Sequence, residues 1–102
     1  MTRVPLIAFM ATLLAAPAWA DQALAQKNAC MACHGVDKKI VGPAFQEIAK
    51  RYAGQKDAQA TLATHIKAGG SGRWGPVPMP AQPALSEADA GTLAGWVLTT
   101  AK

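Results

Sequence analysis

Side chains that ligate metals are scarce in this sequence, which has two cysteines and two histidines in 102 residues. Three of these four lie together as Cys30, Cys33 and His34, and the fourth is His65. A structural zinc site needs about four ligands. Because only His65 is available beyond the cluster, the pattern does not favour zinc.

Sustained alternation of apolar and polar residues, which is typical of β-strands, is also missing. A Cys-x-x-Cys pair lowers the pKa of a thiol and is typical of thioredoxin-like disulfide exchange proteins. Their fold needs strand-helix-strand units, so that class remains only an alternative here. A structural disulfide between Cys30 and Cys33 is a second alternative, although closing so short a loop gains little entropy.

Dense runs of one charge are absent. The net charge is +4, and the lysines and arginines are scattered along the chain. Because no basic stripe is interleaved with aromatic residues, we expect no nucleic-acid partner. A mild positive charge is suited to steering an acidic protein partner.

No apolar run is long enough to cross a bilayer comfortably, which takes about 20 residues in a helix. The longest run, Val4 to Ala16, follows Arg3 and precedes the small-x-small site at residues 18–20. This order is typical of a cleaved secretory signal peptide. We therefore predict that residues 1–20 are removed and that residues 21–102 form one exported domain without stable membrane insertion.

Large apolar side chains are few in the predicted domain, where alanine supplies much of the apolar content. A domain of this size buries a modest fraction of its surface and usually needs a staple, a metal or a cofactor. A bulky apolar cofactor inside the fold would supply the missing apolar mass.

The sequence does contain Cys30-Met31-Ala32-Cys33-His34, which is the pattern needed for covalent haem attachment. The two thiols can form thioethers with the two vinyl groups, and the adjacent imidazole can reach the iron from one face. The sequence therefore predicts one covalently attached haem c, held by Cys30 and Cys33, with His34 as an axial iron ligand.

Helical periodicity and helix-terminus signals predict an all-α domain of about four short helices. Pro43 fits the first position of one helix, Asp57 is expected to cap another, and Ser86 opens a capping box. The expected helices cover residues 21 or 22 to 33, residues 43–52, residues 58–68 and the segment after residue 86.

The segment from Gly70 to Leu85, called the strap below, is longer than ordinary loops of compact domains and is therefore either functional or disordered. Prolines at positions 76, 78 and 80 alternate with Val77 and Met79 and pre-order an extended conformation. A histidine-bound haem iron lacks a sixth ligand, and methionine in that position raises the reduction potential. Met79 is favoured as this ligand, and His65 is the alternative.

Together, these motifs resemble the small bacterial class I cytochromes c, and most closely the cytochrome c-551 type. The resemblance implies a small single-domain class I cytochrome c fold whose helices wrap around the haem. It also implies that the Pro43 carbonyl accepts the imidazole N–H of His34, and that Trp74 donates its indole N–H to a haem propionate. The matching segments are residues 30–34, 41–43, 74–80 and 93–98.

The implied function is that of a periplasmic monohaem electron carrier and not of an enzyme. Such a carrier shuttles single electrons between membrane oxidoreductases and terminal reductases or oxidases, by outer-sphere transfer through an exposed haem edge. A peroxidase-like or gas-binding haem protein with an open sixth position is the alternative. We expect a monomer whose redox partners dock on a small apolar patch near the haem edge. The expected patch residues are Met31, Ala32, Ile40, Pro76, Val77 and Pro78, with Lys27, Lys38 and Lys39 at the rim.

His65 is expected to tune the reduction potential. The matching position in the resembling family lies close to a haem propionate, and histidine changes its charge near neutral pH. A propionate favours the imidazolium, whereas burial opposes it. A positive charge favours the reduced state, so the potential should be higher at low pH. A solvated helix histidine without such coupling is the alternative.

Overall fold

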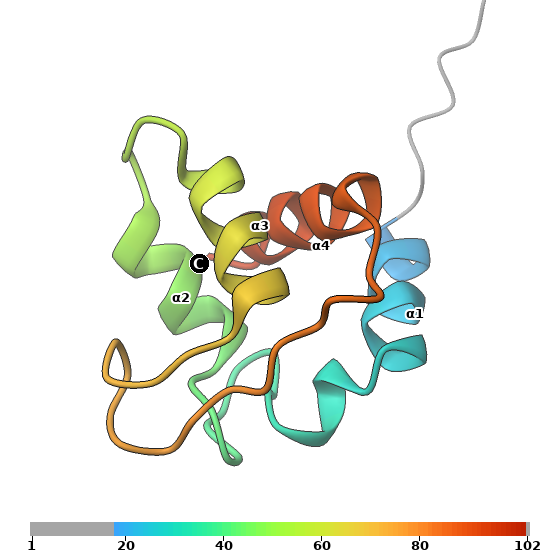
Figure 1. The fold of residues 1–102 in the computed structure, drawn as a ribbon. Coiled ribbons are helices and arrows are strands. Elements are labelled where there is room, and N and C mark those ends of the chain that lie inside the picture. The colour runs from blue at the N-terminus through green and yellow to red at the C-terminus, as the bar shows by residue number, and fades with distance from the viewer. Residues whose placement is uncertain (1–17, 102) are drawn as a thin grey trace, which may run out of the picture.

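The computed structural model describes residues 18–101, in which four α-helices and one turn of 3-10 helix are joined by loops (Figure 1). Among these residues there is no β-strand, and the prediction of an all-α domain is confirmed. The predicted signal peptide, residues 1–20, lies outside the described residues except for its last three positions. The elements are α1 (Ala18–Lys27), η1 (Cys30–Ala32), α2 (Phe45–Tyr52), α3 (Ala58–Ala68) and α4 (Glu87–Thr99).

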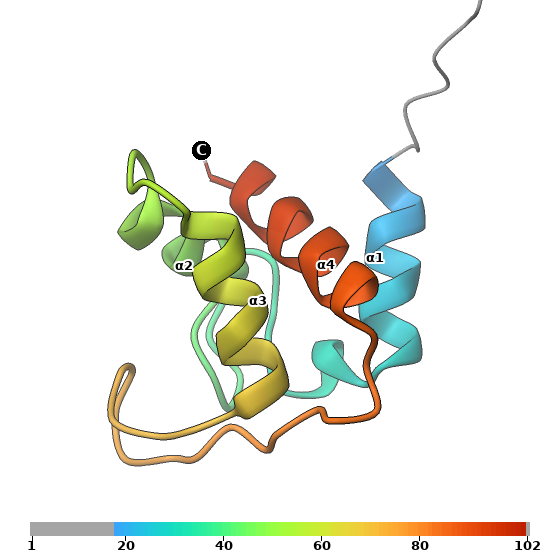
Figure 2. The same cartoon turned by 45° about the horizontal axis from the view of Figure 1, so that its top comes forward.

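Helix α4 is the element against which the other helices pack. It contacts α1, α2 and α3, and it lies between α1 and α3 in both views (Figures 1 and 2). Its start has the predicted cap, because the Ser86 hydroxyl accepts a hydrogen bond from the backbone N–H of Asp89 at 3.0 Å. The predicted inward face is also found, since Leu93, Trp96 and Val97 are buried.

The core is thin, and its most completely buried residues are alanines. Ala90 and Ala94 have 0% of their surface exposed, whereas Phe45, Leu93 and Trp96 keep a few per cent. These three large side chains line a cavity, which accounts for their residual exposure. The rings of Phe45 and Trp96 meet edge to face with centroids 5.1 Å apart, an arrangement that contributes roughly 1 kcal/mol beyond the buried area.

The first helix differs from the prediction at its C-terminal end. It ends at Lys27 and does not continue to Cys33, because Ala29 adopts a left-handed conformation with φ 60°. The Leu24 carbonyl of the last turn accepts from both the backbone N–H and the side-chain amide of Asn28, at 3.2 and 2.9 Å. The chain then turns into η1, which begins at Cys30.

Two predicted helix starts differ in detail. Ala44 is the N-cap of α2, so Pro43 lies one residue before the cap and not at the first helical position. Asp57 does occupy the N-cap of α3, but its φ is 61° and its side chain makes no capping hydrogen bond. The predicted bounds of α3 are confirmed, and Gly69, with φ 66°, follows its last residue.

The left-handed Ala29 predicts an unusual response to glycine. Ala29→Gly should raise the free energy of unfolding by about 0.5–1 kcal/mol, because relief of the left-handed strain exceeds the added entropy of the unfolded chain. Ala23 is exposed in the interior of α1, and Ala23→Gly should lower the same quantity by up to about 1 kcal/mol. Denaturant unfolding of both variants measures the difference. A loss of stability in Ala29→Gly as large as that in Ala23→Gly would contradict the argument.

Candidate functional site

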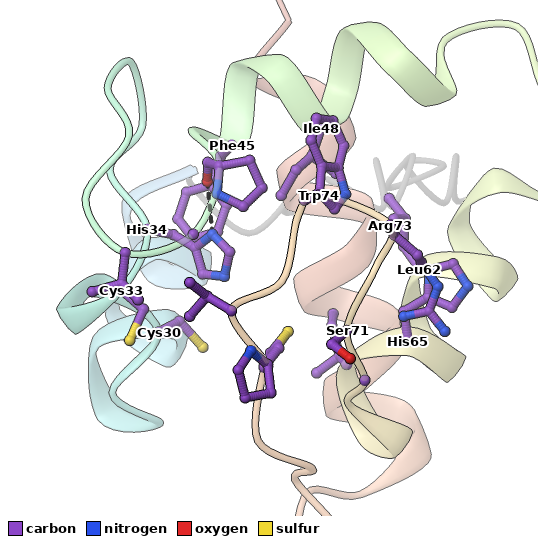
Figure 3. Close-up of a pocket in the computed structure, with 18 of the residues that line it drawn as sticks. Cys30, Cys33, His34, Phe45, Ile48, Leu62, His65, Ser71, Arg73 and Trp74 are labelled. Atoms are coloured by element: carbon purple, nitrogen blue, oxygen red, sulfur yellow. Dashed lines mark hydrogen bonds between the residues drawn. The ribbon is translucent and has the colours of Figure 1, made fainter.

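One cavity brings together the residues that the sequence analysis singled out. It lies between η1, the inner faces of α2, α3 and α4, and the strap (Figure 3). Its wall is mostly apolar, and its polar members are confined to a few positions. The predicted site residues that line it are Cys30, Cys33, His34, Pro43, His65, Trp74 and Met79.

The two cysteines lie on one side of this cavity, at η1 (Figure 3). The backbone N–H groups of Cys33 and His34 both donate to the Cys30 carbonyl, at 3.2 and 3.0 Å, and this tight turn brings the three residues close together. No disulfide joins the two sulfurs. Burial raises the pKa of the Cys30 thiol above its ordinary value. Thiol–disulfide exchange requires a lowered thiol pKa, so the buried surroundings of Cys30 do not favour that alternative.

The imidazole of His34 is held in one orientation. Its Nδ1 lies 2.7 Å from the Pro43 carbonyl oxygen. Since a carbonyl can only accept, Nδ1 carries the proton and Nε2 keeps its lone pair. The ring also stacks on Phe45, with centroids 5.1 Å apart and planes inclined by 22°. A Cβ added to Gly42 would lie 2.6 Å from the ring, so only glycine fits at that position.

Met79 is held by the strap, which returns to the end of α3. Backbone hydrogen bonds run in both directions between Gly70 and Met79, at 3.0 and 2.8 Å. Gly69 lies directly beneath, because a Cβ there would come within 2.5 Å of the Met79 carbonyl oxygen. Met79 is half-buried, whereas residues 70–78 are exposed. The strap therefore presents this one thioether to the cavity.

Trp74 is fixed by a contact that the sequence analysis did not anticipate. The guanidinium carbon of Arg51 lies 4.4 Å from the centroid of the indole. Nη1 of the same arginine donates to the Arg73 carbonyl oxygen. The contact joins α2 to the strap across 22 positions in the sequence, and neither arginine belongs to a recognisable motif. The one sequence feature that could have indicated this contact is that Arg73 directly precedes Trp74.

His65 lines the cavity from α3, and its ring meets that of Tyr52 edge to face with centroids 6.2 Å apart. Burial lowers the pKa of His65 below its ordinary 6.5, and the positive charge of Arg73 lowers it further. The groups that face His65 are thus Tyr52 from α2 and Arg73 from the strap.

The arrangement fits a haem better than a bare metal ion. Within residues 18–101, no three histidine, cysteine or acidic side chains come close enough to hold a metal. A metal at this cavity must therefore bring its own equatorial ligands, as porphyrin iron does. The apolar wall suits a porphyrin, and His34 and Met79 offer the nitrogen and sulfur donors that haem iron accepts.

The sequence is similar to known proteins over nearly all of residues 21–102. The model of the cytochrome c family, described as "Cytochrome c", matches residues 21–101. Cytochrome c-552 of Nitrosomonas europaea is 53% identical over 89 residues, which cover 87% of this chain and 86% of that protein. Cytochrome c-551 of Pseudomonas aeruginosa is 50% identical over 90 residues, covering 86% of each.

Solved structures share the fold. The crystal structure of wild-type Nitrosomonas europaea cytochrome c552 matches with a TM-score of 0.76 at 52% identity, covering 78% of this chain and 98% of that one. The class 1 cytochrome MtoD of Sideroxydans lithotrophicus ES-1 matches with a TM-score of 0.74 at 30% identity, covering 86% and 100%. The predicted class I fold is confirmed.

The position of Arg73 predicts how His65 titrates. In the purified protein, Arg73 should hold the midpoint of the His65 ring titration, followed by NMR, lower than it would be without that charge, because a nearby positive charge opposes protonation. Arg73→Gln removes that charge and should move the midpoint to higher pH. Lys67→Gln is the control, because Lys67 faces a separate hollow between α3 and α4. A midpoint that responds equally to both substitutions would show that Arg73 has no specific effect.

Proposed function

Because the chain belongs to the cytochrome c family, whose model matches residues 21–101, we propose that it is a periplasmic carrier of single electrons between redox proteins. The family assignment itself makes the chain an electron-transfer protein with one covalently attached haem c, and not an enzyme. When bound, the haem supplies an iron that takes one electron from a reduced donor and gives it to an oxidised acceptor.

Six residues of this chain hold that group in the proposal. Cys30 and Cys33 would form the thioethers, and Nε2 of His34 and the sulfur of Met79 would bind the iron. Pro43 supports this assignment, since its carbonyl fixes the protonated nitrogen of His34 at 2.7 Å. Trp74 donates its indole N–H to a carboxylate of the group, and the Arg51 contact holds that ring in place.

The observation that carries the proposal is the presentation of Met79 to the cavity. Gly69 and Gly70 fix the backbone of Met79 by close approach and by paired hydrogen bonds. A sulfur ligand held in this way leaves no open position for a small molecule or a peroxide. His34 and Met79 would both hold the iron throughout, so the chain would rearrange little when the bound group gains or loses an electron, as an electron carrier requires. This favours a carrier over the gas-binding or peroxidase-like alternative.

Electron exchange is proposed to occur through an apolar patch beside the cavity. Ile40, Val41 and Val77 have 51%, 48% and 59% of their surface exposed. Of these, Val41 was not predicted, whereas the predicted Met31 is half-buried and packs against the core. The exposed Lys38 and Lys39 border the patch. Small apolar contacts with charged rims suit redox partners, because such encounters must also dissociate quickly.

The proposed location rests on the N-terminal sequence. Among residues 18–101, no helix is both long and apolar enough to cross a membrane. Export by a cleaved signal peptide over residues 1–20 would place the domain 21–102 in the periplasm. Haem attachment through two cysteines fits that compartment. In the proposal the exported domain is a monomer.

Replacement of Met79 tests the function. Met79→Ala should let the reduced protein bind carbon monoxide stoichiometrically at neutral pH, and it should lower the reduction potential markedly, because a soft ligand that favours ferrous iron is gone. Met31→Ala is the matched control, since Met31 is the only other methionine after residue 20 and packs on the core. It should leave both properties close to those of the parent.

The measurements are a carbon monoxide difference spectrum and a redox titration of each purified protein. If the unmutated reduced protein binds carbon monoxide readily at neutral pH, the sixth position is open and the chain is not a simple carrier.

A further inference from the structure

The side of the cavity away from Cys30 and Cys33 carries a cluster of basic groups. Arg73 and His65 lie there together (Figure 3), and Arg51 contacts the same part of the strap from α2. We propose that Arg73 binds a carboxylate of the haem and that Arg51 is the residue that positions it. This inference rests on the proposed function and assigns roles to two residues that the motifs leave unexplained.

Neither arginine is paired with a carboxylate of the described chain. Within residues 18–101, the one ion pair joins Lys50 to Glu47 on the exposed side of α2. Arginine keeps its charge at every physiological pH. Arg73 lines the cavity beside His65, and Arg51 contacts the backbone of Arg73, so positive charge gathers on this side with no carboxylate of the described chain to balance it. The cluster therefore indicates an anion that comes from outside the chain.

A haem bound through Cys30 and Cys33 brings such anions to this side of the cavity. The two vinyl groups of a porphyrin are attached to one half of the ring, and the two propionates are attached to the opposite half. Thioethers at η1 therefore direct the propionates toward the far side, where Arg73 lies (Figure 3). The planar fork of arginine matches the two oxygens of a carboxylate.

The Arg73 side chain folds back toward α3. Its Nη1 lies 3.3 Å from the point where a Cβ on Gly70 would be, which places the guanidinium beside the first residue of the strap, close to the end of α3. Its charge also contributes to the lowered pKa of His65 on α3. Both observations place the positive charge at the rim of the cavity.

Arg51 fixes the backbone from which that side chain projects. Its Nη1 donates to the Arg73 carbonyl oxygen at 2.6 Å, and its guanidinium carbon lies 4.4 Å from the Trp74 ring centroid. One contact uses an in-plane N–H and the other uses the face of the guanidinium. A lysine at this position keeps the charge but cannot make both contacts in this geometry.

Redox titration of the haem-loaded protein tests the role of Arg73. At the ambient potential where the parent is half reduced, Arg73→Gln should lower the ratio of reduced to oxidised protein about threefold to tenfold, because an uncompensated carboxylate disfavours the added electron. Arg73→Lys should restore most of the ratio. Lys67→Gln is the control, because it removes one positive charge from α3 at the separate hollow. It should change the ratio of reduced to oxidised protein less than Arg73→Gln does.

Salt separates a carboxylate contact from a distant surface charge. In 1 M salt the Debye length is about 3 Å, so a distant charge is screened, while the effect of a contact persists. The proposal is overturned if Arg73→Gln matches Lys67→Gln, or if its effect disappears in 1 M salt. A chain that shows no reversible one-electron step in any variant would instead refute the proposed function.

A double-variant cycle tests the role of Arg51. Arg51→Lys should lower the reduced-to-oxidised ratio in the parent, since Arg73 is then held less firmly. In the Arg73→Gln background the same substitution should cause no further fall, because the residue that it positions is gone. Equal effects in the two backgrounds would mean that Arg51 acts independently and would remove it from the proposal.

Discussion

The imidazole of His34 is constrained by three neighbours, and the rest of the site is arranged around it. The Pro43 carbonyl selects the tautomer, Phe45 covers one part of the ring, and Gly42 leaves room for the ring to approach the backbone. Pro43 can do this because it precedes the N-cap of α2, so its carbonyl is not taken up by the helix. Phe45 in turn packs on Trp96 of α4. The orientation of one nitrogen lone pair is thereby tied to the packing of two helices.

The thin core and the cavity follow from the same composition. Alanines allow α4 to approach its neighbours closely, and the few large side chains surround a cavity that they do not fill. A bound haem would complete this core, since its ring adds apolar surface where the chain has little. Cofactor binding and folding are then coupled. Gly42 preserves the space that the His34 ring needs, and Gly69 does the same for the backbone of Met79.

Local chemistry explains which parts of the fold were predictable. The end of α3 and the cap of α4 follow from Gly69 and Ser86, each of which acts within one helical turn. The start of α3 was predicted at the right residue, although Asp57 makes no capping hydrogen bond there. The end of α1 was missed because Ala29 is left-handed, and alanine gives no signal for that conformation. All the predicted site residues line one cavity. The motifs that carry them belong to segments whose backbone is held by hydrogen bonds, such as the turn at Cys30 and the pairing of Gly70 with Met79. Arg51 was missed because its contact with the strap exists only in the folded chain.

The intact mass of the protein isolated from the periplasmic fraction tests the central claim, that Cys30 and Cys33 hold one haem in an exported domain. We expect a single species with the mass of residues 21–102 plus one haem, which acid-acetone extraction does not remove. Recovery of residues 21–102 as a free dithiol, or with a disulfide between Cys30 and Cys33, would contradict it.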